Sequence, residues 1–316
     1  MQLLAIGEIL WDVIDDCEIL GGAPLNFSAA AQRLGGSALL LTGVGNDPRG
    51  IRAIDSMKAL GLSTGLVQIL PGKDTGTALV TADGTGNARF LIRRPVAFDE
   101  FELDQGAMSA IEAFDPQWIY FGTLAQTNQP TEDILRRLLS RLPKARCFYD
   151  INLRDGHWNL PLVQRLSSCA SIVKLNESEA EVLSQLTQPS AVFSLEQFCR
   201  HWTSTYGVTT ICVTLGSEGC AVFTEGTLQR FEGFKVKVVD TVGSGDAFAA
   251  GFLHGYDLKW TTVWTATLAN ALGALVASRV GATPAWTSAE CWHLIAENRS
   301  IEAQSVADLR GPDCLS

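Results

Sequence analysis

The first sixty residues alternate short apolar runs with helical patterns. Residues 3–6 and 38–44 are apolar runs of strand length, and they predict two buried strands. Residues 26–34 and 48–60 carry apolar positions at helical spacing, and glycines follow both segments, as is typical where helices end. This strand–helix–strand–helix order predicts a parallel sheet with helices on both faces.

The pattern then changes to consecutive strands. Residues 65–70, 76–82 and 87–93 predict three strands, because turn sequences built on Pro-Gly and Asp-Gly separate them. Consecutive strands inside a strand–helix chain favour an antiparallel β flap that projects from the sheet. We therefore expect a small β lid formed by about residues 10–21 and 64–95.

The strand–helix alternation resumes after the flap. Further strands are expected at residues 118–121, 147–151, 172–175, 210–214, 220–224 and 229–239. Further helices are expected at residues 131–142, 178–186, 245–256, 262–279 and 288–297. No repeat or linker divides the chain, so residues 1–316 are expected to form one α/β domain with a mostly parallel central sheet.

Composition and charge narrow the function classes. The chain has 316 residues, 47% of them hydrophobic, and a net charge of −10, which argues against the broad basic surface that nucleic acids require. None of the eight cysteines has C-x-x-C spacing, so we expect buried free thiols and no zinc site. The amino-terminal segment lacks a basic region, and the apolar stretch at residues 268–280 is too short for a membrane span. A cytoplasmic protein with no membrane or nucleic-acid partner is expected.

The segment from Asp240 to Asp246 carries the first candidate chemistry. Gly243, Ser244 and Gly245 follow a predicted strand and open a predicted helix, where unpaired backbone N–H groups and the helix dipole favour an anion. Asp246 would stand beside that anion as a base for an attacking hydroxyl. By itself, the segment fits equally well a Gly-rich turn in which Asp246 caps the helix.

Two common phosphate-binding sequences are absent. A Rossmann G-x-G-x-x-G fails because Phe248 stands at the third glycine position. A Walker A sequence fails because the one Gly-Lys pair, at Gly72, is followed by Asp74.

A second candidate site lies near the amino terminus. Gly21 and Gly22 allow a ligand to approach the backbone closely, and Asn26 offers both a donor and an acceptor. Together with Asp12 these groups suit a polyhydroxylated ligand. The alternative is a loop followed by Asn26 as a helix cap.

These two segments resemble the two signatures of the PfkB carbohydrate kinase family, which has the ribokinase-like fold. Gly21-Gly-Ala-Pro-Leu-Asn-Phe-Ser28, continuing to Gly45, is similar to the first signature, and Asp240 to Gly251 matches the second position by position. The two signatures occur in the family's order, and the resemblance covers essentially the whole chain.

The resemblance implies a catalytic centre and two cofactors, ATP and Mg²⁺. In this family a sugar hydroxyl attacks the γ-phosphate of ATP; Asp246 matches the catalytic base, and the amides of Gly243, Ser244 and Gly245 match the anion hole. Asn176 and Glu179 resemble the N-x-x-E motif that organises Mg²⁺ and phosphates, and the alternative for this pair is a helix capping box.

The resemblance also implies a nucleotide loop and a cation site. Thr214, Gly216 and Gly219 look like the nucleotide loop, and Asn270 matches a residue that flanks the adenine, the alternative being a polar residue on a helix face. The family commonly binds a monovalent cation such as K⁺, for which the matching positions are Asp240, Val242, Val276, Arg279 and Gly281. Ala285 stands where relatives often carry a hydroxyl, which leaves the K⁺ requirement open.

The substrate is expected to be a sugar. Residues 7–12, 21–24 and 150–154 resemble the fructokinase branch, which converts D-fructose to fructose 6-phosphate. Arg154 would bind the substrate or the γ-phosphate, the alternative being a surface ion pair, and 2-keto-3-deoxygluconate kinases carry a similar Asn-x-Arg segment. Ribose, a nucleoside, or sugar binding without catalysis are further alternatives. Exposed lid edges favour a homodimer through the lid.

Overall fold

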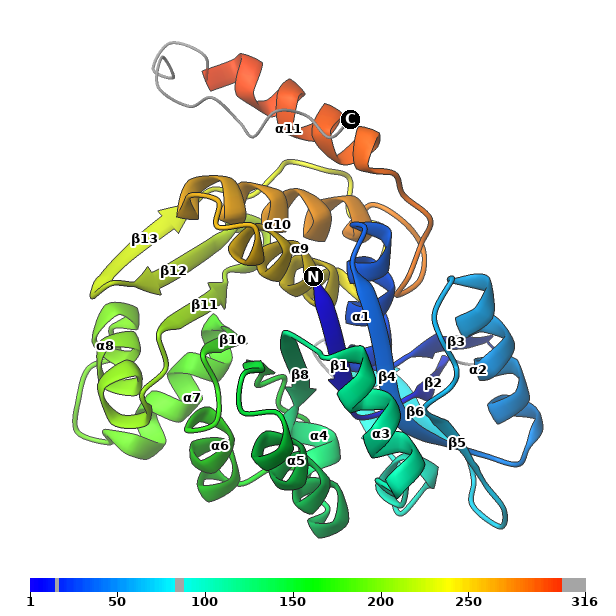
Figure 1. Cartoon of the computed structure of the whole chain (residues 1–316). Coiled ribbons are helices and arrows are strands. Elements are labelled where there is room, and N and C mark those ends of the chain that lie inside the picture. Colours follow the sequence, from blue (N-terminus) through cyan, green and yellow to red (C-terminus); the bar gives the residue numbers. More distant parts are fainter. Residues whose placement is uncertain (15–16, 83–87, 303–316) are drawn as a thin grey trace.

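A nine-stranded sheet forms the centre of the protein. The computed structural model describes residues 1–14, 17–82 and 88–302. The strand order is β13-β12-β11-β10-β9-β8-β1-β4-β5; the strands from β11 to β5 are parallel to one another, and β12 and β13 are antiparallel additions at one edge (Figure 1). The strands are β1 Gln2–Ile6, β4 Ser37–Gly45, β5 Val67–Leu70, β8 Trp118–Gly122, β9 Arg146–Asp150, β10 Ile172–Asn176, β11 Thr210–Thr214, β12 Cys220–Thr224 and β13 Thr227–Phe231.

Helices cover both faces of this sheet. Successive residues of β1 alternate between two core clusters: Leu3 and Ala5 pack in one, Leu4 and Ile6 in the other, because side chains on a strand point to opposite faces. The first cluster involves α1 Ala23–Arg33, α2 Pro48–Ala59, α9 Ser244–Asp257, α10 Thr262–Ala277 and α11 Ser288–Glu302. The second involves α3 Gln105–Phe114, α5 Gln129–Arg141, α6 Leu160–Ser167, α7 Glu177–Thr187 and α8 Leu195–Tyr206; the short helix α4 is Thr123–Gln126.

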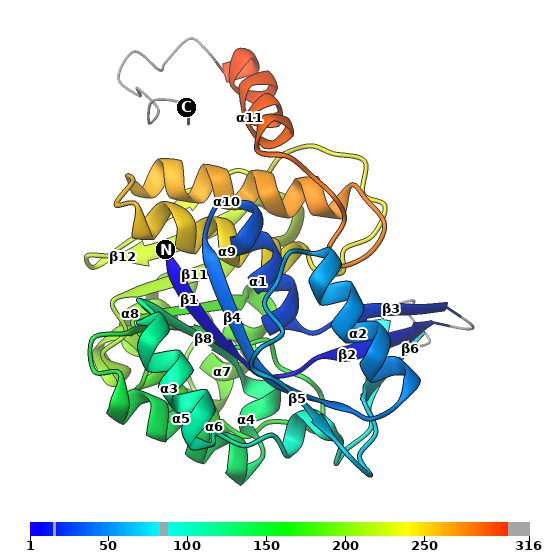
Figure 2. The ribbon, with the colours of Figure 1, turned by 45° about the vertical axis from the view of Figure 1, so that its right-hand side comes forward.

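A smaller sheet projects from the large one, as Figure 2 shows. Its order is β3-β2-β6-β7, in which the outer pairs are antiparallel and the central pair, β2 with β6, is parallel. Its strands are β2 Leu10–Ile14, β3 Cys17–Gly21, β6 Gly76–Ala82 and β7 Ala88–Ile92. The predicted turn at residues 83–86 and residue 87 lie outside the described residues. The α/β class predicted from the sequence, with a mostly parallel central sheet and a small β lid, is confirmed.

The structure differs from the expected elements in two places. The strand expected at residues 65–70 within the flap pairs instead with β4 of the large sheet, where Val67 lies opposite Thr42. The strand expected at 229–239 ends at Phe231, because Gly233 turns to place its amide on the Glu218 carbonyl, at 3.1 Å. The helices α3, α6 and α8 were not singled out from the sequence.

All seven cysteines in the described part of the chain are free thiols. Five of them are buried, as expected from their apolar surroundings, whereas Cys17 and Cys169 are exposed. Across the described residues, no helix combines the length and the apolar character needed to cross a bilayer.

Candidate active site

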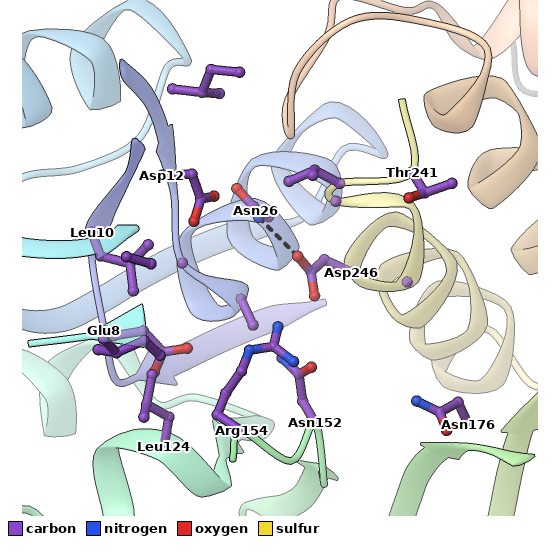
Figure 3. A pocket seen from close by; sticks show the side chains of 18 of the residues that line it. Glu8, Leu10, Asp12, Asn26, Leu124, Asn152, Arg154, Asn176, Thr241 and Asp246 are labelled. Carbon is purple, nitrogen blue, oxygen red and sulfur yellow. Dashed lines mark hydrogen bonds between the residues drawn. The ribbon is translucent and has the colours of Figure 1, made fainter. Parts of the chain in front are cut away.

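A cavity of about 490 Å³ lies at the carboxyl ends of the parallel strands, beside the small sheet. This is the edge at which α/β sheets collect their ligands. Both segments singled out from the sequence line it, so the fold brings together residues that are far apart in the chain (Figure 3). The predicted residues that line it are Asp12, Gly22, Asn26, Arg154, Asn176, Glu179, Thr214, Asp240, Val242, Gly243, Gly245 and Asp246.

Gly243 is the residue on which helix α9 begins. Its φ of +77° is in the left-handed region, and a Cβ there would lie 2.1 Å from the carbonyl oxygen of Ala282, so both conformation and space require glycine. Gly243 offers no side-chain cap to the first turn of α9, whose N–H groups and dipole therefore face the cavity beside Gly245. Ser244 is turned toward Thr241, to which its amide donates at 3.2 Å and its hydroxyl at 2.7 Å.

Asp246 joins the two sequence motifs. Asn26 Nδ2 donates to Asp246 Oδ2 at 2.8 Å, and both side chains are buried. Burial, and secondarily the charge of Asp150, raise the pKa of Asp246 to about 6, although Lys174, the hydrogen bond from Asn26 and Arg154 act to lower it. A carboxylate with this pKa is ionised near neutrality and basic enough to take a proton from a hydroxyl.

A buried ion pair between Lys174 and Asp150 lies next to Asp246 and the glycine loop. Lys174 Nζ lies 3.1 Å from both oxygens of Asp150, whose Oδ2 also accepts a hydrogen bond from the hydroxyl of Tyr120 at 3.2 Å. Lys174 Nζ is 3.2 Å from the place where a Cβ on Gly245 would stand, so its ammonium lies beneath the glycine loop. Sequence reasoning did not single out Lys174. Its signal was a lone cation within the apolar strand β10.

The opposite side of the cavity carries more carboxyl groups. Burial raises the pKa of Asp12 to about 6, and the charge of Arg154 opposes that shift. Arg154 lines the cavity, and its Nη1 donates to the Leu153 carbonyl at 3.2 Å. Glu8, which falls within the fructokinase-like segment 7–12 but was not predicted as a site residue, also lines the cavity and is 4% exposed. Gly21 borders the same corner, since a Cβ there would lie 2.8 Å from Asp12 Oδ2.

Asn176 and Glu179 form the capping box that was the alternative to a phosphate site. Each accepts a 2.8 Å hydrogen bond from the backbone N–H of the other. The second carboxylate oxygen of Glu179 accepts from the Leu153 amide at 2.7 Å, which ties the loop that carries Arg154 to helix α7. Both residues also line the cavity, so capping and a role beside the nucleotide are compatible.

The predicted nucleotide residues are only partly assembled. Thr214, at the end of β11, lines the cavity, while Gly216 and Gly219 lie in the following turn, which contains the 3-10 helix η2 Gly216–Glu218. Asn270 donates its amide to the carbonyls of Phe231 and Glu232 at 3.3 and 3.1 Å, and so holds the end of β13 to helix α10.

Two of the residues expected around a monovalent cation, Val242 and Gly281, contact Asp240. Its carboxylate accepts from the amide of Val242 at 3.0 Å and from that of Gly281 at 2.9 Å. The carbonyl of Val276 accepts from the Arg279 amide at 3.0 Å, and the Arg279 guanidinium pairs with Glu290. Within the described ranges, no group of three His, Cys, Asp or Glu side chains is placed to hold a metal ion, so a cation here would need backbone or ligand oxygens.

Comparison with known proteins identifies the family. Residues 12–289 match the pfkB family carbohydrate kinase. The chain is 27% identical over 286 residues to the probable fructokinase-7 of Arabidopsis thaliana, covering 85% of this chain and 81% of that protein. It is similar in structure to a Xylella fastidiosa fructokinase with bound ATP, with a TM-score of 0.82 and 23% identity over 94% of this chain and 98% of that one. It is also similar to a double-mutant fructokinase of Vibrio cholerae O395 in a form with fructose, ADP and potassium ion bound. The TM-score is 0.77 and the sequence identity 25%, over 93% of this chain and 98% of that one.

The match covers most of the chain, so the protein belongs to the pfkB family of carbohydrate kinases. It is therefore a phosphotransferase that acts on a sugar.

Proposed function

We propose that this kinase is an ATP-dependent fructokinase that transfers the γ-phosphoryl group of ATP to the 6-hydroxyl of D-fructose. The observation that carries the proposal is the charge of the sugar end of the cavity. Asp12, Asp246 and the partly ionised Glu8 line it, together with the guanidinium of Arg154. The other cation among the described lining residues, Lys174, is paired with Asp150. Such a surface attracts the hydroxyl groups of a neutral sugar and repels a sugar acid or a sugar phosphate.

Asn26 adds a second reason for a polyhydroxylated ligand. While its Nδ2 holds Asp246, its Oδ1 is buried without a hydrogen-bond partner among the described residues. A buried acceptor of this kind costs stability unless a ligand supplies a donor, and a sugar hydroxyl does so. The fructokinases among the similar proteins support the same substrate class.

The site residues divide the phosphoryl transfer between them. Asp246 accepts the proton of the attacking sugar hydroxyl. At the same time the hydroxyl oxygen bonds to the γ-phosphorus, and the bond between the γ-phosphorus and the ADP oxygen breaks. The Gly243 and Gly245 amides at the start of α9, with the Lys174 ammonium beneath them, stabilise the negative charge of the phosphoryl oxygens.

Asn176 and Glu179 fit a place near Mg²⁺ because both line the cavity at the carboxyl end of β10. When bound by nucleotide oxygens, Mg²⁺ neutralises part of the phosphate charge. We further propose K⁺ at Asp240 and a homodimer through the lid edges. The K⁺ site rests on the family resemblance, and the homodimer rests on the exposed edges expected for the lid.

An acceptor screen tests the proposal. ADP release with Mg-ATP would be measured over fructose, ribose, 2-keto-3-deoxygluconate, tagatose and adenosine, with Asp246→Asn as the inactive reference. Fructose should give the highest kcat/KM, and Asp246→Asn should lower it at least about 1,000-fold. A higher kcat/KM for another acceptor overturns fructose as the substrate, and ADP release from none of them overturns the catalytic assignment.

A further inference from the structure

Glu8 places a buried carboxyl group in the wall of the cavity, directly after strand β1. The side chain lines the same cavity as Asp246 and is 4% exposed. Its Oε2 is fully buried, and among residues 1–14, 17–82 and 88–302 it has no hydrogen-bond partner. A folded protein rarely leaves a buried carboxylate oxygen unsatisfied, because the group has lost water and gained nothing in return.

Among the described residues, the groups around Glu8 affect its charge without giving Oε2 a hydrogen bond. Burial, with a smaller contribution from the charge of Asp246, raises the pKa of Glu8 from 4.5 to about 7. Hydrogen bonds from the backbone N–H groups of Glu8 and Ala23 and the charge of Arg154 only partly offset this. In Figure 3, the Arg154 side chain lies between the Glu8 and Asp246 side chains.

The backbone fixes the position of Glu8 relative to the reaction centre. Gly22 begins helix α1 with a φ of +114°, and a Cβ there would lie 2.4 Å from the Glu8 carbonyl oxygen, so the two backbones are in close contact. Asn26 stands one turn later on the same helix and binds Asp246. The first turn of α1 therefore contacts both residues: Gly22 packs on the Glu8 backbone and Asn26 binds Asp246, and both carboxyl groups line the cavity.

We propose that Glu8 contacts the acceptor sugar, with Oε2 forming a hydrogen bond to a hydroxyl other than the one that is phosphorylated. The proposal rests on the proposed sugar kinase function and deepens it, because it makes Glu8 a determinant of which sugars are accepted. The unpartnered, buried oxygen in the cavity wall is the observation that carries it.

The variants Glu8→Ala and Glu8→Gln test this, with Glu181→Gln as the matched control. Glu181 is an exposed residue on helix α7 and receives the same replacement. For Glu8→Ala, the KM for fructose at saturating ATP should rise about 10- to 100-fold, with the KM for ATP within about 3-fold of the wild type. Glu8→Gln retains one hydrogen-bonding group and should fall between wild type and Glu8→Ala. Glu181→Gln should leave both constants unchanged.

Analogues of fructose that each lack one hydroxyl provide the second readout. One analogue should lose affinity in the wild type and lose little more in Glu8→Ala, because the contact is already gone; the others should lose affinity equally in both proteins. Strictly additive losses for every analogue overturn the proposal, as does an unchanged KM for fructose in Glu8→Ala.

A purely structural role for Glu8 would change the KM for ATP and for fructose together and would lower the thermal midpoint of Glu8→Gln, and that outcome also overturns the proposal. Failure of the proposed function can be distinguished from failure of the proposal on Glu8. If fructose is not the substrate, the wild type releases no ADP with fructose. Glu8→Ala would then still show the selectivity shift on whichever sugar the wild type accepts.

Discussion

Asn26 and Asp246 are joined by a 2.8 Å hydrogen bond that spans 220 positions of the sequence. The bond links helix α1, which carries Asn26, to helix α9, which carries Asp246. Because it stabilises the ionised form of Asp246, it ties the basicity of that carboxylate to the placement of helix α1.

Replacing Asn26 should therefore shift the pH profile. The wild-type kcat/KM should fall as the pH drops through about 6, because protonated Asp246 cannot accept a proton. In Asn26→Ala the hydrogen bond that lowers the pKa of Asp246 is lost, so the acid limb should move to higher pH, and kcat/KM at pH 7 should fall at least about 10-fold. An unshifted acid limb would show that another group controls it. Asn128→Ala, far from Asp246 in sequence and at the start of α5, is the control.

Lys174 offers a test that separates stability from catalysis. Lys174→Met leaves Asp150 buried without its cation and should cost about 3–5 kcal/mol in the free energy of unfolding, measured by denaturant titration. Adding Asp150→Asn should restore most of that stability. It should not restore kcat, since the ammonium beneath Gly245 remains absent. Recovery of kcat in the double variant would show that Lys174 does not stabilise the charge of the phosphoryl group.

Gly243 has a matched control in Gly226. Both have a φ of +77°, but a Cβ on Gly226 would meet nothing within 4 Å, whereas one on Gly243 would collide with the Ala282 carbonyl. Gly226→Ala should cost about 1 kcal/mol of stability from backbone strain and leave kcat unchanged. Gly243→Ala should lower kcat at least about 100-fold, because the anion-binding turn must move. Equal kinetic effects of the two variants would contradict this role of the turn.

The buried carboxyl of Glu8 predicts a pH-dependent stability. Its pKa is raised from 4.5 to about 7 in the folded protein, so the unfolded chain ionises first as the pH rises, and stability is lost between about pH 4.5 and 7. Glu8→Gln removes the ionisable carboxyl group and should be more stable than the wild type by about 3 kcal/mol at pH 8, with no such advantage at pH 4. Thermal unfolding at the two pH values measures the difference, and a constant offset would contradict the assignment.

Much of the fold could be predicted because most strands of the large sheet are short apolar runs between helical patterns. The strand β5 was misplaced because four residues of strand pattern do not say which sheet they join; the pairing with β4 is a tertiary contact. Helices α3, α6 and α8 were not singled out from the sequence, although predicted helices such as α1 and α7 are of similar length.

The glycine loop and Asp246 were predictable because the small residues, the start of a helix and the acidic residue are adjacent in the chain. Lys174 and Glu8 were not, because each looks like one polar residue beside an apolar strand until the fold supplies its neighbours. Asn270 is the opposite case. The resemblance places it beside the adenine, whereas in the structure its side-chain amide donates to the carbonyls of Phe231 and Glu232.

Strand β1 of the large sheet passes into β2 of the lid with only Gly7, Glu8 and Ile9 between them. Glu8 lies in this connection and Asp12 lies on β2, and both line the cavity. A sugar that contacts both carboxyl groups would hold the small sheet in a fixed orientation relative to the large one. A ligand that reaches only one of them would not, and water could then reach the phosphoryl group.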